Sequence, residues 1–98
     1  MKLSESFYKK RMAQQHGRCY YCGCELILGY RDVSNTEIDH IKPLSKYKDG
    51  TRGNLCLSCY DCNRKKADLE LIQFKQLVLN KYPYKLIRGM FYFEFIGL

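Results

Sequence analysis

Four cysteines in this chain of 98 residues are spaced as two C-x-x-C pairs, Cys19 with Cys22 and Cys59 with Cys62. The thiolates of such a pair can bind one zinc ion from a tight turn, and two pairs complete a tetrahedral site. Because four thiolates leave no open position, we expect this Zn²⁺ to be structural. The alternative is two disulfides, which form in oxidising compartments. We expect the two remaining cysteines, Cys24 and Cys56, to behave as small buried hydrophobic residues.

Asp39 and His40, which lie between the cysteine pairs, put a carboxylate next to an imidazole. A neutral imidazole is available near pH 7 and can take a proton from water. A carboxylate is a hard ligand for a divalent cation. Adjacent residues of a regular strand point to opposite faces. If both side chains act at one site, the strand should end or distort at His40, and Pro43 is consistent with that.

The order and spacing of these features resemble the HNH family, also called the ββα-metal nucleases, in its form with two zinc knuckles. The resemblance covers residues 19–66. Its elements are both cysteine pairs, the Asp39-His40 pair, Pro43, Asn54-Leu55, and Asn63 directly after Cys62. The third letter of the motif is Asn63 where many members have histidine, so this chain resembles the HNN variant.

The resemblance implies a role for each matching residue. His40 would be the general base, and Asp39 and Asn63 would hold one catalytic ion. Asn54 would tie the active-site loop together and help to hold His40. Carboxylate and amide oxygens favour Mg²⁺ or Mn²⁺ over softer metals. The implied reaction is hydrolysis of DNA to a 5′-phosphate and a 3′-hydroxyl. Glu37 could support this site, although a surface charge is the simpler interpretation.

The charge distribution is compatible with a nucleic acid partner but does not prove one. The formal net charge is +7. Residues 1–18 have five basic side chains and one acidic, whereas residues 19–68 have eight basic and seven acidic. We expect duplex DNA as the partner. Four basic side chains near the motif are candidate phosphate contacts: Lys42, Arg64, Lys65 and Lys66. The alternative is that they form a solvated surface.

The pattern of apolar residues predicts a single α+β domain over residues 1–98. A ββα-metal core at 19–66, stapled by zinc, would follow an N-terminal helix at 4–16 that Ser4 or Ser6 caps. Short strands are expected at 25–28, 36–41 and 54–57. A helix should begin near Asp61 or Asn63, break near Asp68 and continue to about Asn80. In the extension at 69–98, alternating phenylalanines predict a strand over 91–95 after a turn at Arg88-Gly89.

No apolar run resembles a secretory signal or approaches the roughly 20 residues of a membrane helix. We therefore expect a cytoplasmic protein that does not contact membranes. The small size suggests an enzyme of a phage or another mobile element. A monomer with one site should nick a duplex, whereas a homodimer could cut both strands. Sequence specificity could come from a protein partner.

Two other functions remain open at this stage. A non-catalytic zinc-bound module that binds nucleic acid would keep the cysteines. A zinc domain that binds another protein would keep them as well. Neither function needs Asp39, His40 and Asn63 together, and that set favours the nuclease.

Overall fold

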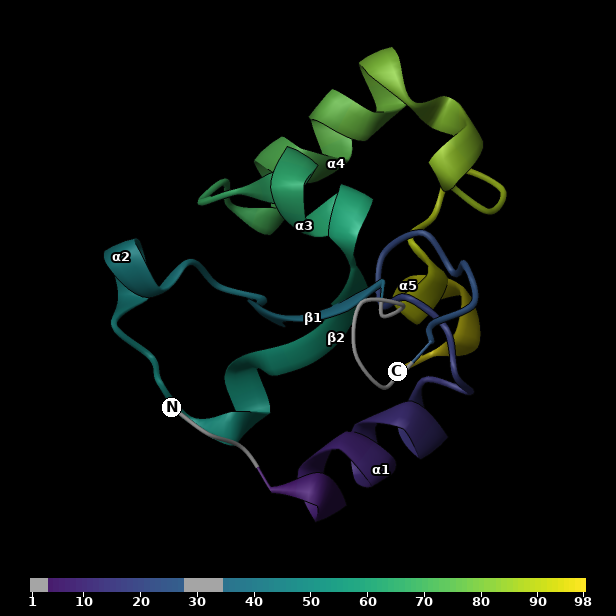
Figure 1. The fold of residues 1–98 in the computed structure, drawn as a ribbon. Coiled ribbons are helices and arrows are strands. Elements are labelled where there is room, and N and C mark those ends of the chain that lie inside the picture. Colours follow the sequence, from purple (N-terminus) through teal and green to yellow (C-terminus); the bar gives the residue numbers. More distant parts are fainter. Residues whose placement is uncertain (1–3, 28–34) are drawn as a thin grey trace.

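A computed structural model of the chain describes residues 4–27 and 35–98. Its centre is a two-stranded antiparallel sheet of β1 (Thr36–His40) and β2 (Leu55–Cys59). In Figure 1, α1 lies below this sheet and α3 lies above it, with α4 beyond α3. The helices are α1 (Glu5–Gln14), α2 (Leu44–Tyr47), α3 (Tyr60–Lys66), α4 (Leu71–Lys81) and α5 (Tyr92–Ile96), with 3-10 turns at η2 (Arg52–Asn54) and η3 (Pro83–Lys85).

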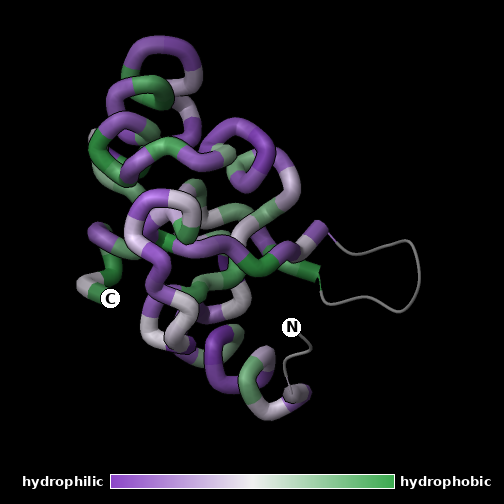
Figure 2. The backbone as a smooth tube through the Cα atoms, turned by 90° about the vertical axis from the view of Figure 1, so that its left-hand side faces the viewer, coloured by the Kyte–Doolittle hydropathy of each residue, from purple (hydrophilic) through white to green (hydrophobic). Residues whose placement is uncertain are grey.

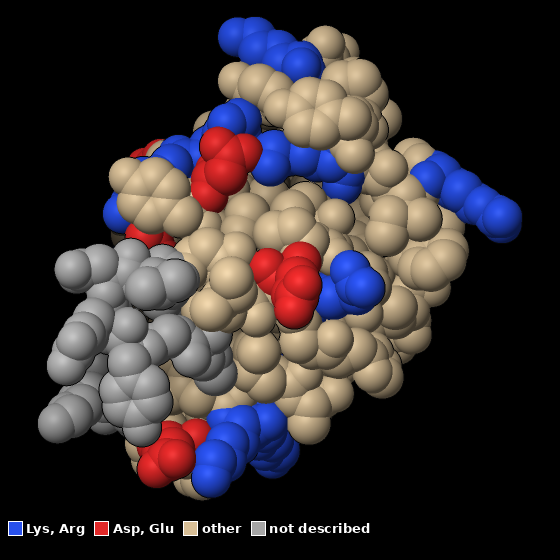
Figure 3. Space-filling model, turned by 45° about the vertical axis from the view of Figure 1, so that its right-hand side comes forward, with Lys and Arg blue, Asp and Glu red and all other residues tan. Residues whose placement is uncertain are grey.

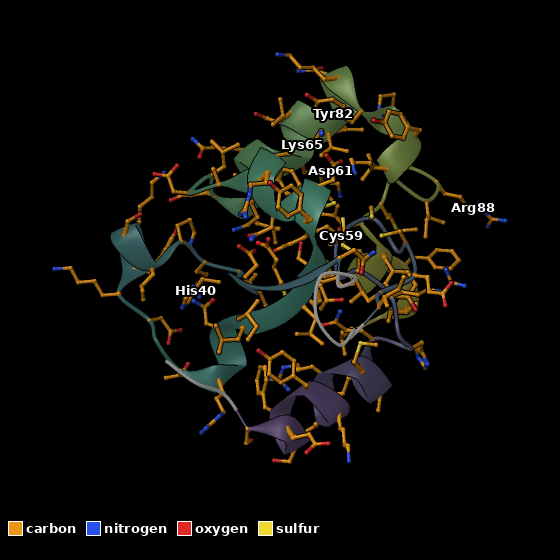
Figure 4. All side chains as sticks on the ribbon, in the orientation of Figure 1. His40, Cys59, Asp61, Lys65, Tyr82 and Arg88 are labelled. Atoms are coloured by element: carbon orange, nitrogen blue, oxygen red, sulfur yellow. The ribbon has the colours of Figure 1, made fainter. Side chains whose placement is uncertain are left out.

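The strand register separates the two ends of the sheet. Thr36 pairs with Cys59 at one end, and His40 pairs with Leu55 at the other. Four residue steps at about 3.3 Å each put these ends roughly 13 Å apart. The sheet therefore keeps Cys59 and His40 apart, at its two opposite ends. Both residues are labelled in Figure 4.

The core is an aromatic cluster that joins distant parts of the chain. Tyr21, Phe74 and Phe91 are almost completely buried. Tyr21 meets Phe74 edge-on at 5.3 Å between ring centroids, and Phe74 stacks on Phe91 at 5.4 Å. Figure 2 shows hydrophobic and hydrophilic residues alternating along the coil of α4 at the top, as expected for a helix with one side in the core.

Most predicted helices and strands are confirmed, with boundaries that differ by no more than three residues. Ser4 caps α1, since its hydroxyl accepts a hydrogen bond from the N–H of Phe7 at 3.3 Å. The expected break near Asp68 lies between α3 and α4, and Ala67 there has a φ of 47°. In the described part of the chain, no helix has both the length and the apolar character needed to cross a membrane.

The predicted strand at 91–95 is wrong, because this segment forms the helix α5. The Arg88-Gly89 turn is present, but within the described residues its only β pairing is the isolated bridge between Ile87 and Met90. The alternating phenylalanines do not share one face. Phe91 is buried, whereas Phe95 is 48% exposed. Packing against the first cysteine pair determines the conformation here, and no local pattern reports that packing.

The predicted strand at 25–28 is also wrong in its described part, residues 25–27. Glu25 forms only an isolated bridge with Arg18, and Leu26 and Ile27 belong to no strand. Residue 28 lies outside the described residues.

Candidate active site

The four paired cysteines form one cluster at the Cys59 end of the sheet. The sulfur atoms of Cys19, Cys22, Cys59 and Cys62 all lie within 4.8 Å of one another. A tetrahedral site with Zn–S bonds of about 2.3 Å needs sulfurs about 3.8 Å apart. The Sγ atoms of Cys22 and Cys59 are 3.8 Å apart. The cluster fits a structural zinc ion.

Backbone N–H groups support both thiol pairs in the same way. In each pair the N–H of the second cysteine donates to the sulfur of the first, at 3.5 Å for Cys22 to Cys19 and 3.3 Å for Cys62 to Cys59. The N–H of Cys59 also donates to Cys19 Sγ at 3.3 Å. Such bonds favour the thiolate form that binds metal.

Lys85 and Asp61 place charge beside the cysteine cluster. Lys85 Nζ donates to Cys62 Sγ at 3.7 Å and pairs with Asp61 at 2.5 Å. Burial opposes the charge on Lys85, but its bond to Asp61 and the nearby thiols raise its pKa above the ordinary lysine value. Hydrogen bonds from Lys65 and Lys85 lower the pKa of Asp61. A lysine ammonium therefore lies against a four-thiolate site, whose charge it can partly offset.

The helix α5 is built onto the first cysteine pair. The N–H groups of Tyr92 and Phe93, at the start of this helix, donate to the carbonyls of Tyr21 and Tyr20 at 2.8 and 3.0 Å. Gly23 has a φ of +75°, and a Cβ there would lie 3.0 Å from the ring of Tyr92. Glycine is thus required both by the backbone conformation and by the close approach of α5.

The two remaining cysteines have different environments. Cys56 is 1% exposed, as expected, and burial raises the pKa of its thiol. Cys24 is exposed, so the prediction that it is a buried hydrophobic residue is wrong. It follows the turn at Gly23, where the chain leaves the cluster towards the surface.

His40 lies at the opposite end of the sheet from the cysteine cluster (Figure 4). The strand β1 ends at His40, as expected. The loop that follows is held by Asn54, which is 5% exposed. Asn54 Oδ1 accepts from the N–H of Lys42 at 2.8 Å, and Nδ2 donates to the carbonyls of Lys42 and Asp49 at 2.9 and 3.0 Å. One amide therefore joins both ends of the loop next to His40.

Asp39 is buried on the α3 side of β1, at 6% exposure. Its Oδ2 accepts a short hydrogen bond from the hydroxyl of Tyr21 and pairs with Lys66 Nζ at 3.1 Å. Lys66 also donates to the carbonyl of His40 at 2.9 Å. Burial and the neighbouring carboxylate of Asp39 raise the pKa of Tyr21, so its hydroxyl keeps the proton that it donates.

Asn63 faces the same side of β1 from α3. Its Nδ2 donates a short hydrogen bond to Glu37 Oε2. Arg64 donates to both oxygens of that carboxylate, at 3.1 and 3.0 Å. Three side-chain pairs thus join α3 to β1: Asn63 and Arg64 with Glu37, and Lys66 with Asp39. Glu37 and Asp39 are two residues apart on one strand face, so Asp39 and Asn63 lie at the same helix–sheet junction.

The candidate phosphate contacts do not all reach the surface. Lys66 is 0% exposed and paired with Asp39, so the expectation that it contacts phosphate is wrong for this residue. Arg64 is exposed but paired with Glu37, and Lys65 is paired with Asp61. Lys42 is exposed, with its ammonium 5.8 Å from the ring centroid of Tyr47. Lys66 is the last residue of α3, and its side chain is buried between this helix and β1, against Asp39 and the carbonyl of His40.

On one face of the molecule, the basic side chains do not form a continuous surface. On the face in Figure 3, basic side chains form separate groups, several with acidic side chains beside them. Such a face attracts a polyanion less strongly than its formal charge alone implies. Binding of a nucleic acid would therefore depend on positions near the active site more than on overall charge.

Sequence reasoning missed two residues with clear structural roles. Tyr21, the residue before Cys22, holds the Asp39 carboxylate, and Lys85 contacts Cys62. In the sequence, Tyr21 is one of two residues between Cys19 and Cys22, and nothing there indicates its contact with Asp39. No sequence signal connects Lys85 to the cysteines, because η3 brings it to them only in the folded chain.

Comparisons with known proteins agree with this geometry. The family model described as "HNH endonuclease" matches residues 19–69, about half of the chain. The crystal structure of the Type II-C Cas9 enzyme from Actinomyces naeslundii is similar, with a TM-score of 0.55 and 26% sequence identity. The match covers 78% of this chain but only 8% of that enzyme. No curated protein matches the chain.

Proposed function

Since this chain belongs to the HNH endonuclease family and is therefore a nuclease, we propose that it cuts DNA with His40 as the general base. Asp39 and Asn63 would hold one Mg²⁺ or Mn²⁺ ion, while the four cysteines hold a structural zinc ion. The observation that supports this most directly is the junction of β1 and α3, which brings Asp39 and Asn63 to one side of the strand that ends in His40.

The donor atoms of Asp39 and Asn63 suit a hard cation. Tyr21 and Lys66 both contact Oδ2 of Asp39, and Oδ1 takes part in neither contact. Glu37 accepts from the nitrogen of the Asn63 amide and leaves the amide oxygen to face elsewhere. One carboxylate oxygen and one amide oxygen are typical Mg²⁺ ligands, and the remaining positions would be filled by water and phosphate.

His40 would take a proton from the attacking water, whose oxygen forms the new bond to phosphorus. The bond from phosphorus to the 3′ oxygen breaks, and that oxygen takes a proton from solvent. The products are a 5′-phosphate and a 3′-hydroxyl. A bound divalent ion would supply charge stabilisation for the phosphate in the transition state. Asn54 and Lys66 would keep His40 in place, through its loop and its carbonyl.

Duplex DNA is the substrate that we propose. Lys42, next to the end of β1, is exposed and could contact a phosphate. Arg64 and Lys65 could do so if they leave their carboxylate partners. One active site per chain would nick one strand, and two chains would be needed to cut both at once. A protein partner could supply sequence specificity.

A non-catalytic zinc-bound nucleic-acid-binding module is the second candidate. One observation favours it: Asp39 already has a buried cationic partner in Lys66, as a purely structural carboxylate would.

The test is conversion of supercoiled plasmid to nicked and linear forms. Zinc-loaded protein freed of other metals by gel filtration is assayed alone, with Mg²⁺ and with Mn²⁺. His40→Ala, checked for zinc content and circular dichroism, is the matched variant. We expect metal-dependent nicking with 5′-phosphate ends, and its loss in His40→Ala. DNA binding by both proteins with cleavage by neither under any condition would favour the binding module.

A further inference from the structure

Glu37 occupies an unusual position next to the proposed metal ligand Asn63. Its carboxylate accepts from the amide nitrogen of Asn63 and is held at both oxygens by Arg64, at 3.1 and 3.0 Å. The guanidinium of Arg64 in turn lies 4.3 Å from the ring centroid of Tyr60. The Glu37 side chain is 27% exposed, so solvent reaches it only in part. Its orientation is thus set by several contacts.

The two ends of an asparagine amide have opposite chemistry. The nitrogen only donates hydrogen bonds, and the oxygen only accepts them or binds a cation. An ionised carboxylate only accepts, so it can bond the nitrogen end but not the oxygen end. A carboxylate beside Asn63 therefore selects one of the two orientations of this amide. The selected orientation turns the oxygen away from Glu37.

We propose that Glu37 is a positioning residue that turns the amide oxygen of Asn63 towards the catalytic cation. The inference rests on the proposed function, because it needs Asn63 to be a metal ligand. Arg64 contributes by fixing both oxygens of Glu37 on the strand. Groups that hydrogen-bond to metal ligands in this way commonly change metal affinity by about 10- to 100-fold.

A double-mutant cycle on metal binding separates positioning from direct ligation. The four proteins are the wild type, Glu37→Met, Asn63→Asp and the double variant. Each is zinc-loaded, and Mn²⁺ affinity is measured from the electron paramagnetic resonance signal of free Mn²⁺. An aspartate at 63 presents an oxygen at either end and needs no orientation. When residue 63 is asparagine, we expect Glu37→Met to weaken Mn²⁺ binding roughly tenfold. In the Asn63→Asp background, we expect Glu37→Met not to weaken it.

Equal weakening in both backgrounds would overturn the proposal, because it would make Glu37 a direct ligand or a general source of negative charge. Glu5→Met is the matched control. It removes a carboxylate from α1 that pairs with Lys9 at 3.4 Å, and it should leave the affinity unchanged. If zinc content and circular dichroism show that Glu37→Met folds poorly, Glu37→Gln replaces it, because glutamine keeps the side-chain length. Glu37→Gln should give the same pattern with a smaller loss of Mn²⁺ affinity.

Failure of the proposed function would look different. If Asp39→Ala and wild type bind Mn²⁺ equally weakly, the metal site itself is absent and both proposals fail. If Asp39→Ala abolishes binding while Glu37→Met has no effect, the metal site stands and only the role of Glu37 is refuted.

Discussion

Side chains that contact the backbone hold the loop next to His40. Asn54 makes three bonds to main-chain groups of Lys42 and Asp49, and Lys66 donates to the carbonyl of His40. These contacts fix the backbone at His40 and in the loop that follows it. The mobility of His40 should therefore depend on Asn54 and Lys66, which bond to main-chain groups.

Replacing Asn54 tests this dependence. Asn54→Ala removes three hydrogen bonds and leaves main-chain groups of the loop without partners, at a cost of about 1–3 kcal/mol in unfolding free energy. Urea unfolding of the zinc-loaded protein measures that cost. Cleavage should fall as well, at saturating metal and DNA, while zinc content stays the same. Asn54→Asp keeps the acceptor but loses both donors, so its loss should be intermediate. Unchanged cleavage in Asn54→Ala would contradict the proposal that Asn54 holds the loop next to His40.

At the scale of elements, α5 is the part of the fold that completes the first cysteine turn. Its first N–H groups bond to the carbonyls of Tyr20 and Tyr21, and its aromatic residues enter the core beside α4. A helix of five residues has little stability of its own. The fold of this segment is therefore fixed by the surface against which it packs.

Two phenylalanines distinguish the helix from the strand that their spacing predicted. In a strand, Phe91 and Phe95 would share one face and have similar roles. In the structure Phe91 is 1% exposed and Phe95 is 48% exposed. Phe91→Ala should lower the unfolding free energy by about 3–5 kcal/mol. Phe95→Ala, the control, should change it by about 0.5 kcal/mol or less. Equal losses in thermal or urea unfolding would contradict the helix.

At the scale of the whole molecule, the sheet separates the cysteine cluster from the proposed active site. The cysteine cluster lies at the end of β2, and His40 lies at the end of β1. Tyr21 links the two, because it lies between two cysteines and bonds to Asp39. Zinc binding should therefore stabilise the metal site of the reaction without taking part in it.

Removal of zinc tests the structural role. Binding at such sites releases about 10–16 kcal/mol, more than the total stability of most small domains. A zinc-selective chelator should abolish the helical circular dichroism signal, and added Zn²⁺ but not Mg²⁺ should restore it. Cleavage should be lost and regained in parallel. A chelated protein with an unchanged thermal unfolding midpoint would show that the cluster does not hold the fold.

Local chemistry was predictable from sequence, and contacts made by folding were not. The cysteine pairs, the end of the strand at His40 and the cap at Ser4 depend on neighbours within a few residues. The burial of Lys66 depends on contacts that it makes across to β1, with Asp39 and the carbonyl of His40. The helix at 92–96 depends on the first cysteine turn. Amino-acid types alone do not report such distant contacts.

Chemical rescue of a His40→Gly variant tests the central claim most directly. The variant should bind DNA and zinc normally but cleave about 10²- to 10⁴-fold more slowly with Mg²⁺. Added imidazole should restore part of the rate, and the restored rate should follow the fraction of imidazole that is neutral as pH is varied. Cleavage by His40→Gly at the wild-type rate would show that another group activates the water.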